Sequence, residues 1–364
     1  MHYFLSCALC GTRQQEDSAA FRCSECNGIL EVNYNYDELK KPSAGSAINN
    51  EKYSFLFPIH RKLFSLNEGG TPLVEKDFLD KKIKLKLETE NPTHSFKDRG
   101  SAVEITKALE FDFNSVCCAS TGNMGFSIAT YAKAAGIKCT IFISKDANPE
   151  KIKKIKGAGA DIVEIEGDFN DALDSAERFA IKSGAFLCGD YHFRKEGQKS
   201  VMFEILEQLK YTVPEFIFVP VGNATLLSAV YKALLEFERL SFINKFPKIV
   251  AVQASGCSPL VTAYNKNKKI ERVKPMTIAD AIAVGYPTFG FEGINSLKAT
   301  GGLAVAVKDH EIMDARKILK DNDVSAEPGG ASAFAGFIKL NKKQKDYFNN
   351  KNCVVIVSGN NEGV

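Results

Sequence analysis

The chain has 364 residues, of which 45% are hydrophobic, and its 47 lysines and arginines nearly balance its 44 aspartates and glutamates. This length and composition allow a substantial buried core and predict two packed lobes. The formal charge of +3 is spread along the chain rather than gathered in one basic block, which argues against a nucleic-acid partner. No stretch approaches the roughly 18 apolar residues of a membrane helix and no signal-peptide pattern opens the chain, so we expect a cytoplasmic protein without a membrane partner.

The first part of the chain carries two Cys-x-x-Cys pairs, Cys7 with Cys10 and Cys23 with Cys26, separated by twelve residues. This is the spacing of a four-thiolate zinc ribbon. Because so short a segment cannot build a core of its own, four thiolates around one ion would replace that core. We therefore expect a zinc-ribbon-like segment over residues 1–35, with a degenerate ribbon of free thiols as the alternative.

From about residue 82, short apolar runs alternate with segments of helical period. The expected strands are 82–87, 116–119, 139–144, 161–165, 216–221, 249–253 and 354–357. The expected helices are 127–135, 149–156, 170–183, 197–209, 226–240, 311–320 and 331–340. This alternation predicts βαβ units, parallel sheets and an α/β fold. Ligands in such folds bind beyond the carboxyl ends of the strands, so the loops that follow strands deserve inspection.

One of these loops, ENPTHSFKDRG at 90–100, contains a lysine suited to covalent chemistry. Lys97 lies between the apolar Phe96 and the charged pair Asp98 and Arg99, where a strand leads into a helix. Partial burial would lower the pKa of this lysine, which suits a Schiff-base lysine because only the neutral amine attacks an aldehyde. The ordinary alternative is a solvated surface lysine.

Two further loops are rich in main-chain amides that could bind anions. PVGNATLLS at 220–228 opens a helix and contains no lysine, so it predicts a site for a cofactor phosphate rather than a nucleotide-binding loop of the Walker type. ASTGNMGFS at 119–127 offers the amides of Ser120, Thr121 and Gly122 to a carboxylate. Both could also be plain turns, because glycine and asparagine tolerate positive φ.

Eight segments of the chain resemble, in family order, the fold type II (β-) family of pyridoxal-phosphate enzymes, and within it the threonine synthases. They are the three loops above, VSGN from 357, NEGGTPLV (67–74), FRKEGQKSVMFEI (193–205), TIADAIAVGYP (277–287) and SAEPGGASAFAG (325–336). The resemblance implies two doubly wound α/β domains after the ribbon-like segment. Residues 36–100 with 195–364 would form the large domain, carrying the cofactor lysine and the phosphate loop, and 101–194 the smaller domain, carrying the asparagine loop.

The resemblance also implies roles for individual residues. Lys97 is the implied Schiff-base lysine and general base, and Phe96 precedes it in the cofactor site. The other implied cofactor contacts are Asn123 to the ring oxygen, Gly222, Asn223, Ala224, Thr225 and Leu226 around the phosphate, and Ser358 facing the pyridine nitrogen. A hydroxyl at that nitrogen leaves it largely unprotonated, which suits elimination and replacement chemistry. For the substrate, Ser120, Thr121 and Gly122 would hold the carboxylate and Arg194 the phosphate.

The implied reaction converts O-phosphohomoserine and water to threonine and phosphate by γ-elimination and β-addition, in a homodimer. The sequence departs from the family pattern at His94, Met124, Cys188 and Gly189, and has GNATL where GNAGN is commoner. These departures leave other substrates open. The alternatives are a cysteate synthase-like enzyme using phosphoserine and sulfite, a serine/threonine ammonia-lyase, and a catalytically silent homologue whose ribbon binds a protein partner.

Overall fold

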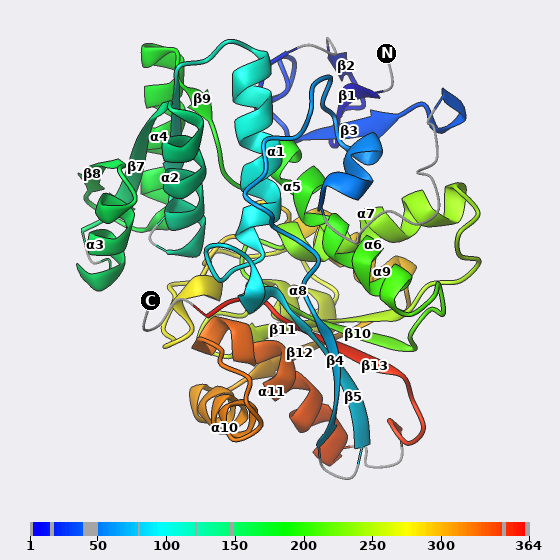
Figure 1. Ribbon diagram of the computed structural model, residues 1–364. Coiled ribbons are helices and arrows are strands. Elements are labelled where there is room, and N and C mark those ends of the chain that lie inside the picture. The colour runs from blue at the N-terminus through cyan, green and yellow to red at the C-terminus, as the bar shows by residue number, and fades with distance from the viewer. Residues whose placement is uncertain are drawn as a thin grey trace. The chain divides into compact units, whose positions relative to one another are not determined.

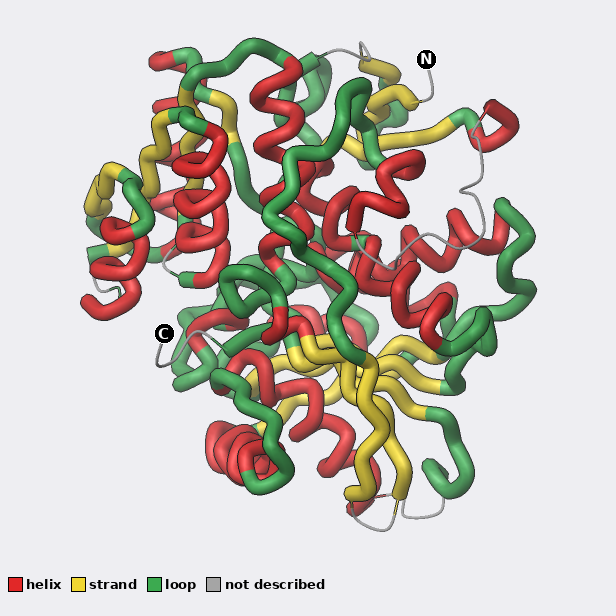
Figure 2. Tube along the Cα trace, in the orientation of Figure 1, coloured by secondary structure: helices red, strands yellow, loops and turns green. Residues whose placement is uncertain are grey.

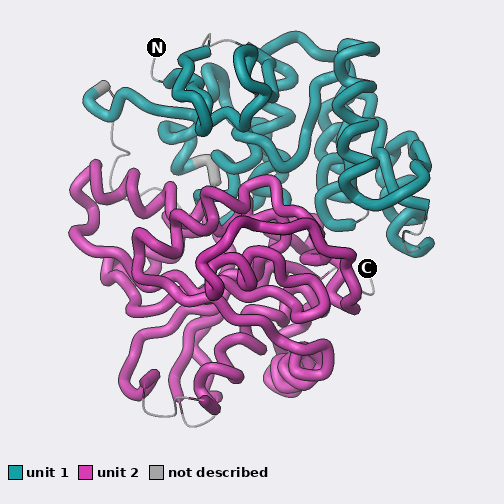
Figure 3. The backbone as a smooth tube through the Cα atoms, turned by 180° about the vertical axis from the view of Figure 1, so that it is seen from behind, with its two compact units in different colours: residues 1–69, 97–200 teal, residues 70–96, 201–364 magenta. Residues whose placement is uncertain are grey.

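The computed structural model describes residues 3–14, 18–38, 50–78, 81–120, 122–145, 147, 149–343 and 347–360. The chain forms two compact units, which are residues 1–69 with 97–200 and residues 70–96 with 201–364 (Figure 3). The boundaries expected from the sequence lie at 35/36, 100/101 and 194/195. The boundary differs at Lys97 because helix α1 (Lys97–Glu110) is continuous and belongs to the first unit from its first residue.

The first unit contains a four-stranded parallel sheet with the order β8-β7-β6-β9. Its strands are β6 (Ser115–Ala119), β7 (Lys138–Ser144), β8 (Asp161–Ile165) and β9 (Phe186–Leu187). Its connecting helices are α2 (Asn123–Ala135), α3 (Pro149–Gly157) and α4 (Phe169–Ser183), seen beside the sheet in Figure 1. Residues of β6, β9 and α4 form its core, among them Cys117, Leu187 and Ala176. Parallel strands joined by helices are the arrangement that the alternating pattern predicted.

Two further helices of the first unit, α1 and α5 (His192–Gln198), pack unusually closely because each has a glycine at the contact. A Cβ atom on Gly197 would lie 2.0 Å from the main-chain oxygen of Arg99. A Cβ atom on Gly100 would lie 2.7 Å from Cγ of Arg194. Only residues without a side chain permit this approach. It brings the first turn of α1, which begins with Lys97, against the helix that carries Arg194.

The N-terminal residues form a three-stranded antiparallel sheet of order β2-β1-β3. Its strands are β1 (Tyr3–Cys7), β2 (Arg13–Gln14) and β3 (Leu30–Tyr34), and the 3₁₀ helices Tyr36–Glu38 and Asn50–Leu56 follow. Alternate residues of β1 and β3 are buried, as expected for a sheet with one covered face. The hydroxyl of Tyr34 donates to Glu196 on α5 at 2.6 Å, and Lys107 on α1 donates to the hydroxyl of Tyr3 at 3.0 Å. These contacts attach the small sheet to α1 and α5.

The second unit contains a six-stranded sheet with the order β12-β11-β10-β13-β5-β4, parallel except for β4 at its edge. Its strands are β4 (Leu73–Phe78), β5 (Lys81–Leu87), β10 (Phe216–Pro220), β11 (Lys248–Ala254), β12 (Leu303–Val307) and β13 (Cys353–Val357). Its helices are α6 (Ser200–Gln208), α7 (Thr225–Arg239), α8 (Pro259–Lys266), α9 (Gly290–Ala299), α10 (Asp309–Lys320) and α11 (Pro328–Lys343), with 3₁₀ turns at Glu88–Glu90 and Asp280–Ile282. Helices α10 and α11 lie beside this sheet (Figures 1 and 2), and their buried residues form the main core with it.

The predicted α/β class is confirmed, and each expected strand and helix overlaps an observed element. The expected elements did not include α8, α9, β4, β9, β12 or the three N-terminal strands, and α1 was not outlined. None of the helices in the described part of the chain combines the length and the apolar character that crossing a bilayer requires.

Candidate functional site

The residues just before Lys97 pair with the end of β13 in the second unit. Ser95 forms an isolated antiparallel bridge with Gly359, and the amide of Phe96 donates to the main-chain oxygen of Ser358 at 3.1 Å. Ser358 is buried. Because Phe96 is bonded covalently to Lys97, this pairing anchors the chain at the residue before the lysine. Of the residues expected at the cofactor, Ser358 follows the end of β13, Phe96 lies on the segment paired with it, and Lys97 is the next residue in the chain.

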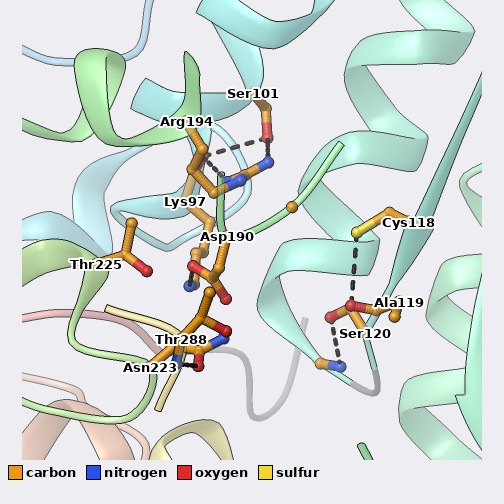
Figure 4. Close-up of polar contacts among 12 residues, drawn as sticks. Lys97, Ser101, Cys118, Ala119, Ser120, Asp190, Arg194, Asn223, Thr225 and Thr288 are labelled. Atoms are coloured by element: carbon orange, nitrogen blue, oxygen red, sulfur yellow. Dashed lines mark hydrogen bonds and ion pairs between the residues drawn. The ribbon is translucent and has the colours of Figure 1, made fainter. Parts of the chain in front are cut away.

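The side chain of Lys97 lies beside a carboxylate within the first unit (Figure 4). Its Nζ atom is 3.9 Å from Oδ1 of Asp190, and the two side chains are 16% and 6% exposed. Burial lowers the pKa of Lys97, while the charge of Asp190 acts in the opposite direction. The lowered pKa agrees with the expectation for a lysine that must lose its proton to react.

The guanidinium of Arg194 is fully buried beneath α1. It donates to the main-chain oxygen of Lys97 at 3.0 Å and to Oγ of Ser101 at 3.2 Å (Figure 4). It also forms an ion pair with Glu104. Its Nε atom is buried and has no hydrogen-bond partner among the described residues. To bind a substrate phosphate, this guanidinium would have to become accessible.

The carboxylate of Glu104 completes this buried cluster. It accepts a hydrogen bond of 2.7 Å from the amide of Gly189 in addition to its ion pair with Arg194. Burial raises the pKa of Glu104 to about 7, although the charge of Arg194 opposes the rise. Glu104 therefore links α1, α5 and the turn that carries Asp190.

The loop before α2 brings Ser120 against the helix N-terminus. Oγ of Ser120 accepts hydrogen bonds from the amides of Gly122 at 3.3 Å and Gly125 at 2.9 Å. Asn123, the first residue of α2, is buried, and Thr121 lies outside the described residues. The Gly122 amide, expected to bind a carboxylate, is thus engaged with Ser120 in this structure.

Three positions at which the sequence departs from the family pattern come together in the first unit. A Cβ atom on Gly189 would lie 3.9 Å from Cε of Met124, and Gly189 has a φ of 135°, which favours glycine. The neighbouring Cys188 is buried. The fourth departure, His94, has a φ of 59°, and its Nδ1 lies 3.1 Å from the main-chain oxygen of Thr89. Met124, Cys188 and Gly189, at which the sequence departs from the family pattern, therefore lie in one region next to Asp190.

In the second unit, loop 222–226 leads from β10 into α7. Ala224 has a φ of 61°, and a Cβ atom on Gly222 would lie 3.1 Å from Cα of Ile282. Oδ1 of Asn223 accepts a hydrogen bond of 2.7 Å from the amide of Thr288 (Figure 4). The first amides of a helix have no intrahelical partners, so this tight turn fits a phosphate group without needing a lysine. The contact of Thr288 with this loop was not expected from the sequence.

The four N-terminal cysteines form a cluster that could bind a metal ion. The ligand sulfurs of Cys7, Cys10, Cys23 and Cys26 all lie within 4.8 Å of one another. The Sγ–Sγ distances are 3.4 Å for Cys7 and Cys26, 3.7 Å for Cys10 and Cys23, and 3.4 Å for Cys10 and Cys26. Thiolates bound tetrahedrally to zinc at about 2.3 Å would be about 3.8 Å apart. The arrangement therefore matches the donor set that the spacing predicted.

The two carboxylates of the cluster around Lys97 were not among the residues expected from the sequence. Asp190 follows β9 closely, so the rule that ligands gather beyond strand ends could have indicated it. Glu104 lies about two helical turns after Lys97 and therefore on the same side of α1. Its burial could not be predicted because α1 carries many charged residues, which normally indicate a solvent-exposed helix.

The amino-acid sequence is similar to those of known enzymes. Residues 64–359 match the profile of the family described as pyridoxal-phosphate dependent enzyme. Threonine synthase of Methanocaldococcus jannaschii is 37% identical over 92% of this chain and 86% of its own length. Threonine synthase of Methanosarcina acetivorans is 36% identical over 93% of this chain and 87% of its own.

Solved structures give a similar result for the fold. The structure of maize serine racemase has a TM-score of 0.70 and 26% identity, covering 81% of this chain and 89% of that one. The processed threonine deaminase isoform 2 of Solanum lycopersicum has a TM-score of 0.68 and 24% identity, covering 79% of this chain and 78% of that one.

Proposed function

Because this chain belongs to the pyridoxal-phosphate-dependent enzyme family, we propose that it is a threonine synthase, which converts O-phosphohomoserine and water to threonine and phosphate. The observation that carries the proposal is the 36–37% identity, over more than nine-tenths of the chain, to two proteins named threonine synthase. The similarity extends beyond the family profile, which begins at residue 64.

The residues present fit the cofactor. Lys97 would hold pyridoxal phosphate covalently, loop 222–226 its phosphate, and Asn123, Phe96 and Ser358 its ring. The tight turn at Gly222 and the amides at the start of α7 support the phosphate assignment. Bound pyridoxal phosphate supplies an electron sink that stabilises negative charge developing at the substrate carbons.

The protein's own groups would hold the substrate and move its protons. The Lys97 amine would carry protons to and from the α and β carbons, and its burial helps it to lose a proton. Ser120, Thr121 and Gly122 would hold the substrate carboxylate. Arg194 would contact the substrate phosphate after its guanidinium has moved from Glu104, a rearrangement that the burial of both groups makes necessary.

We further propose that the cysteine cluster binds one structural zinc ion. Four thiolates complete a tetrahedral shell and leave no open position for a substrate, so the ion would stabilise the small sheet rather than take part in the reaction. The cluster lies on the sheet that contacts α1 and α5 through Tyr3 and Tyr34. The ion would thereby support the helices that carry Lys97 and Arg194.

The family resemblance also leads us to propose a homodimer in the cytoplasm. All ten cysteines are free, which supports a reducing compartment. Sedimentation equilibrium of the purified protein would test the dimer, which predicts twice the chain mass of 39.9 kDa.

A second candidate is a lyase of the same fold whose substrate carries no phosphate, such as a serine/threonine ammonia-lyase. The observation that favours it is the pairing of the charges around Lys97. Arg194 is paired with Glu104, and Lys97 is paired with Asp190. A substrate without a phosphate needs no counter-charge from Arg194 and leaves the buried pair of Arg194 and Glu104 in place.

A product assay distinguishes the candidates. The protein would be incubated separately with O-phosphohomoserine, with phosphoserine plus sulfite, and with threonine, while phosphate, ammonia and the amino-acid products are measured. Equal amounts of threonine and phosphate from O-phosphohomoserine support the threonine synthase. If threonine releases ammonia and O-phosphohomoserine does not react, the protein is the ammonia-lyase and not the threonine synthase. Formation of cysteate from phosphoserine and sulfite indicates a cysteate synthase. No product from any mixture favours the silent homologue.

A further inference from the structure

We propose that Asp190 is a further catalytic residue, whose carboxylate is the ionic partner of the Lys97 amino group and stabilises the protonated form of that group when the lysine is not joined to the cofactor. The proposal rests on the cofactor role proposed for Lys97. It does not depend on which amino acid is the substrate.

The position of Asp190 is determined by the turn between β9 and α5. Its Oδ1 lies 3.9 Å from Nζ of Lys97, and its side chain is 6% exposed. The preceding Gly189 adopts a φ of 135°, and its amide donates to Glu104 at 2.7 Å. On the other side, the amide of Tyr191 donates to the main-chain oxygen of Gly189 at 2.7 Å. These bonds hold the turn so that the carboxylate lies beside the lysine.

Among the described residues, the charged groups that act on Lys97 are Asp190 in the turn, Arg194 on α5 and Glu104 on α1 itself. The Cys118 thiol on β6 also acts on the lysine but is uncharged, because burial raises the pKa of this thiol well above its ordinary value. Arg194 and Glu104 form one ion pair, and Lys97 and Asp190 form the other. Within this cluster, Asp190 is therefore the carboxylate paired with the lysine.

The direction of the effect follows from the charges. Burial favours the neutral amine of Lys97, whereas the Asp190 carboxylate favours the ammonium form and so raises the pKa of the lysine. Removing the Asp190 charge should leave Lys97 neutral down to a lower pH. A neutral amine reacts with the cofactor aldehyde, so capture of the cofactor should then continue at a lower pH.

The same pairing has a use during turnover. When Lys97 is not joined to the cofactor, its neutral amine would take a proton from one substrate carbon, so that a C–H bond breaks and an N–H bond forms at Nζ. The electron pair of the broken bond would stay on the substrate, where bound pyridoxal phosphate would stabilise it. The reverse transfer would later return the proton to another carbon. Asp190 remains a carboxylate throughout and stabilises the ammonium group between the two transfers.

The test measures cofactor capture rather than turnover. Pyridoxal phosphate is added to the cofactor-free full chain, and the rate at which the visible absorption band appears is followed across a pH series. Asp190→Asn should move the midpoint of this pH–rate curve down by about 1–3 units, the usual effect of a neighbouring opposite charge. Asp190→Glu, which keeps a carboxylate, should return the midpoint most of the way to the wild-type value. Asp174→Asn, at an exposed position of α4, should leave the midpoint unchanged.

The outcomes separate this proposal from the proposed activity. A folded Asp190→Asn variant with the wild-type midpoint overturns the role of Asp190. Wild type that captures no cofactor overturns both this role and the cofactor role of Lys97. If capture shifts as expected but O-phosphohomoserine yields no threonine, Asp190 keeps its role and the proposed activity fails.

Discussion

Arg194 donates a hydrogen bond of 3.0 Å from its guanidinium to the main-chain oxygen of Lys97. The same oxygen also accepts from Oγ of Ser101 at 3.2 Å. Helix α5 therefore holds the first turn of α1, and the lysine to which we assign the cofactor begins that turn. Arg194 thus positions the backbone of Lys97 in this structure, whatever it contacts in a substrate complex.

Replacing Arg194 should strongly destabilise the protein. Arg194→Ala leaves the carboxylate of Glu104 buried without its ion-pair partner, which costs about 3–5 kcal/mol in the free energy of unfolding. Adding Glu104→Gln should recover part of that loss, because the unpaired charge is then absent. Urea unfolding of the two single variants and the double variant measures this coupling.

The control for this cycle is Arg178→Ala, because Arg178 is an exposed arginine on α4. Its effect should stay within about 0.5 kcal/mol. If the two effects at Arg194 and Glu104 simply add, the buried pair does not stabilise the packing of α1 and α5 as described.

The contact between α1 and α5 should not tolerate a side chain at Gly197. Gly197→Ala places a methyl group 2.0 Å from the main-chain oxygen of Arg99, so the helices must separate. We expect a loss of at least about 1–3 kcal/mol in unfolding free energy, the usual effect of overpacking. Because Lys97 begins α1, cofactor affinity should fall as well.

The matched control is Gly157→Ala at the end of α3, where the added methyl group meets no atom within 4 Å. This substitution should be neutral or slightly stabilising. Equal stability of the two alanine variants, measured by thermal unfolding, would contradict the close helix contact.

The cysteine cluster should retain about one zinc ion per chain when the protein is purified without a chelator. Cys10→Ser should lower the zinc content and the melting temperature, because the remaining three thiolates bind the ion less well. Ser24→Ala, which changes a non-ligand within the second Cys-x-x-Cys pair, should retain the metal. Metal analysis by mass spectrometry decides the question, and four freely titratable thiols in a metal-free wild type would indicate a degenerate ribbon.

Much of the fold could be predicted because the strands of the two larger sheets are short apolar runs followed by turn residues. The apolar runs before loops 119–127 and 220–228 became β6 and β10, and the glycines and asparagines after them became turns into helices. The cysteine spacing predicted a cluster that the structure confirms. In each case, the residues that carry the signal lie close together in the sequence or at a characteristic spacing.

Helix α1 was harder to delimit because its buried positions carry charged residues. Asp98, Arg99, Glu104 and Lys107 are all buried, whereas charged side chains normally indicate a solvent-exposed face. Their burial is compensated by partners elsewhere in the chain. Lys107, for example, donates to Tyr3 from the N-terminal sheet. Contacts between residues so far apart in the chain cannot be predicted from a single sequence.

The detailed geometry of the candidate site could not be predicted for the same reason. The family resemblance identified Lys97 and Arg194, but not that Arg194 would face Glu104 or that Asp190 would lie beside Lys97. The direction of a long side chain depends on the charges packed around it. The roles assigned to the site residues therefore stay predictions until they are tested chemically.

The most direct test of the account is to locate the cofactor on the chain. The protein would be loaded with pyridoxal phosphate, reduced with borohydride, digested and mapped by mass spectrometry. We expect the modification on Lys97 alone, and Lys97→Ala should lose both the modification and the visible absorption band while remaining folded. Attachment to a different lysine, or an unchanged band in Lys97→Ala, would contradict the assignment of Lys97 as the residue that holds the cofactor.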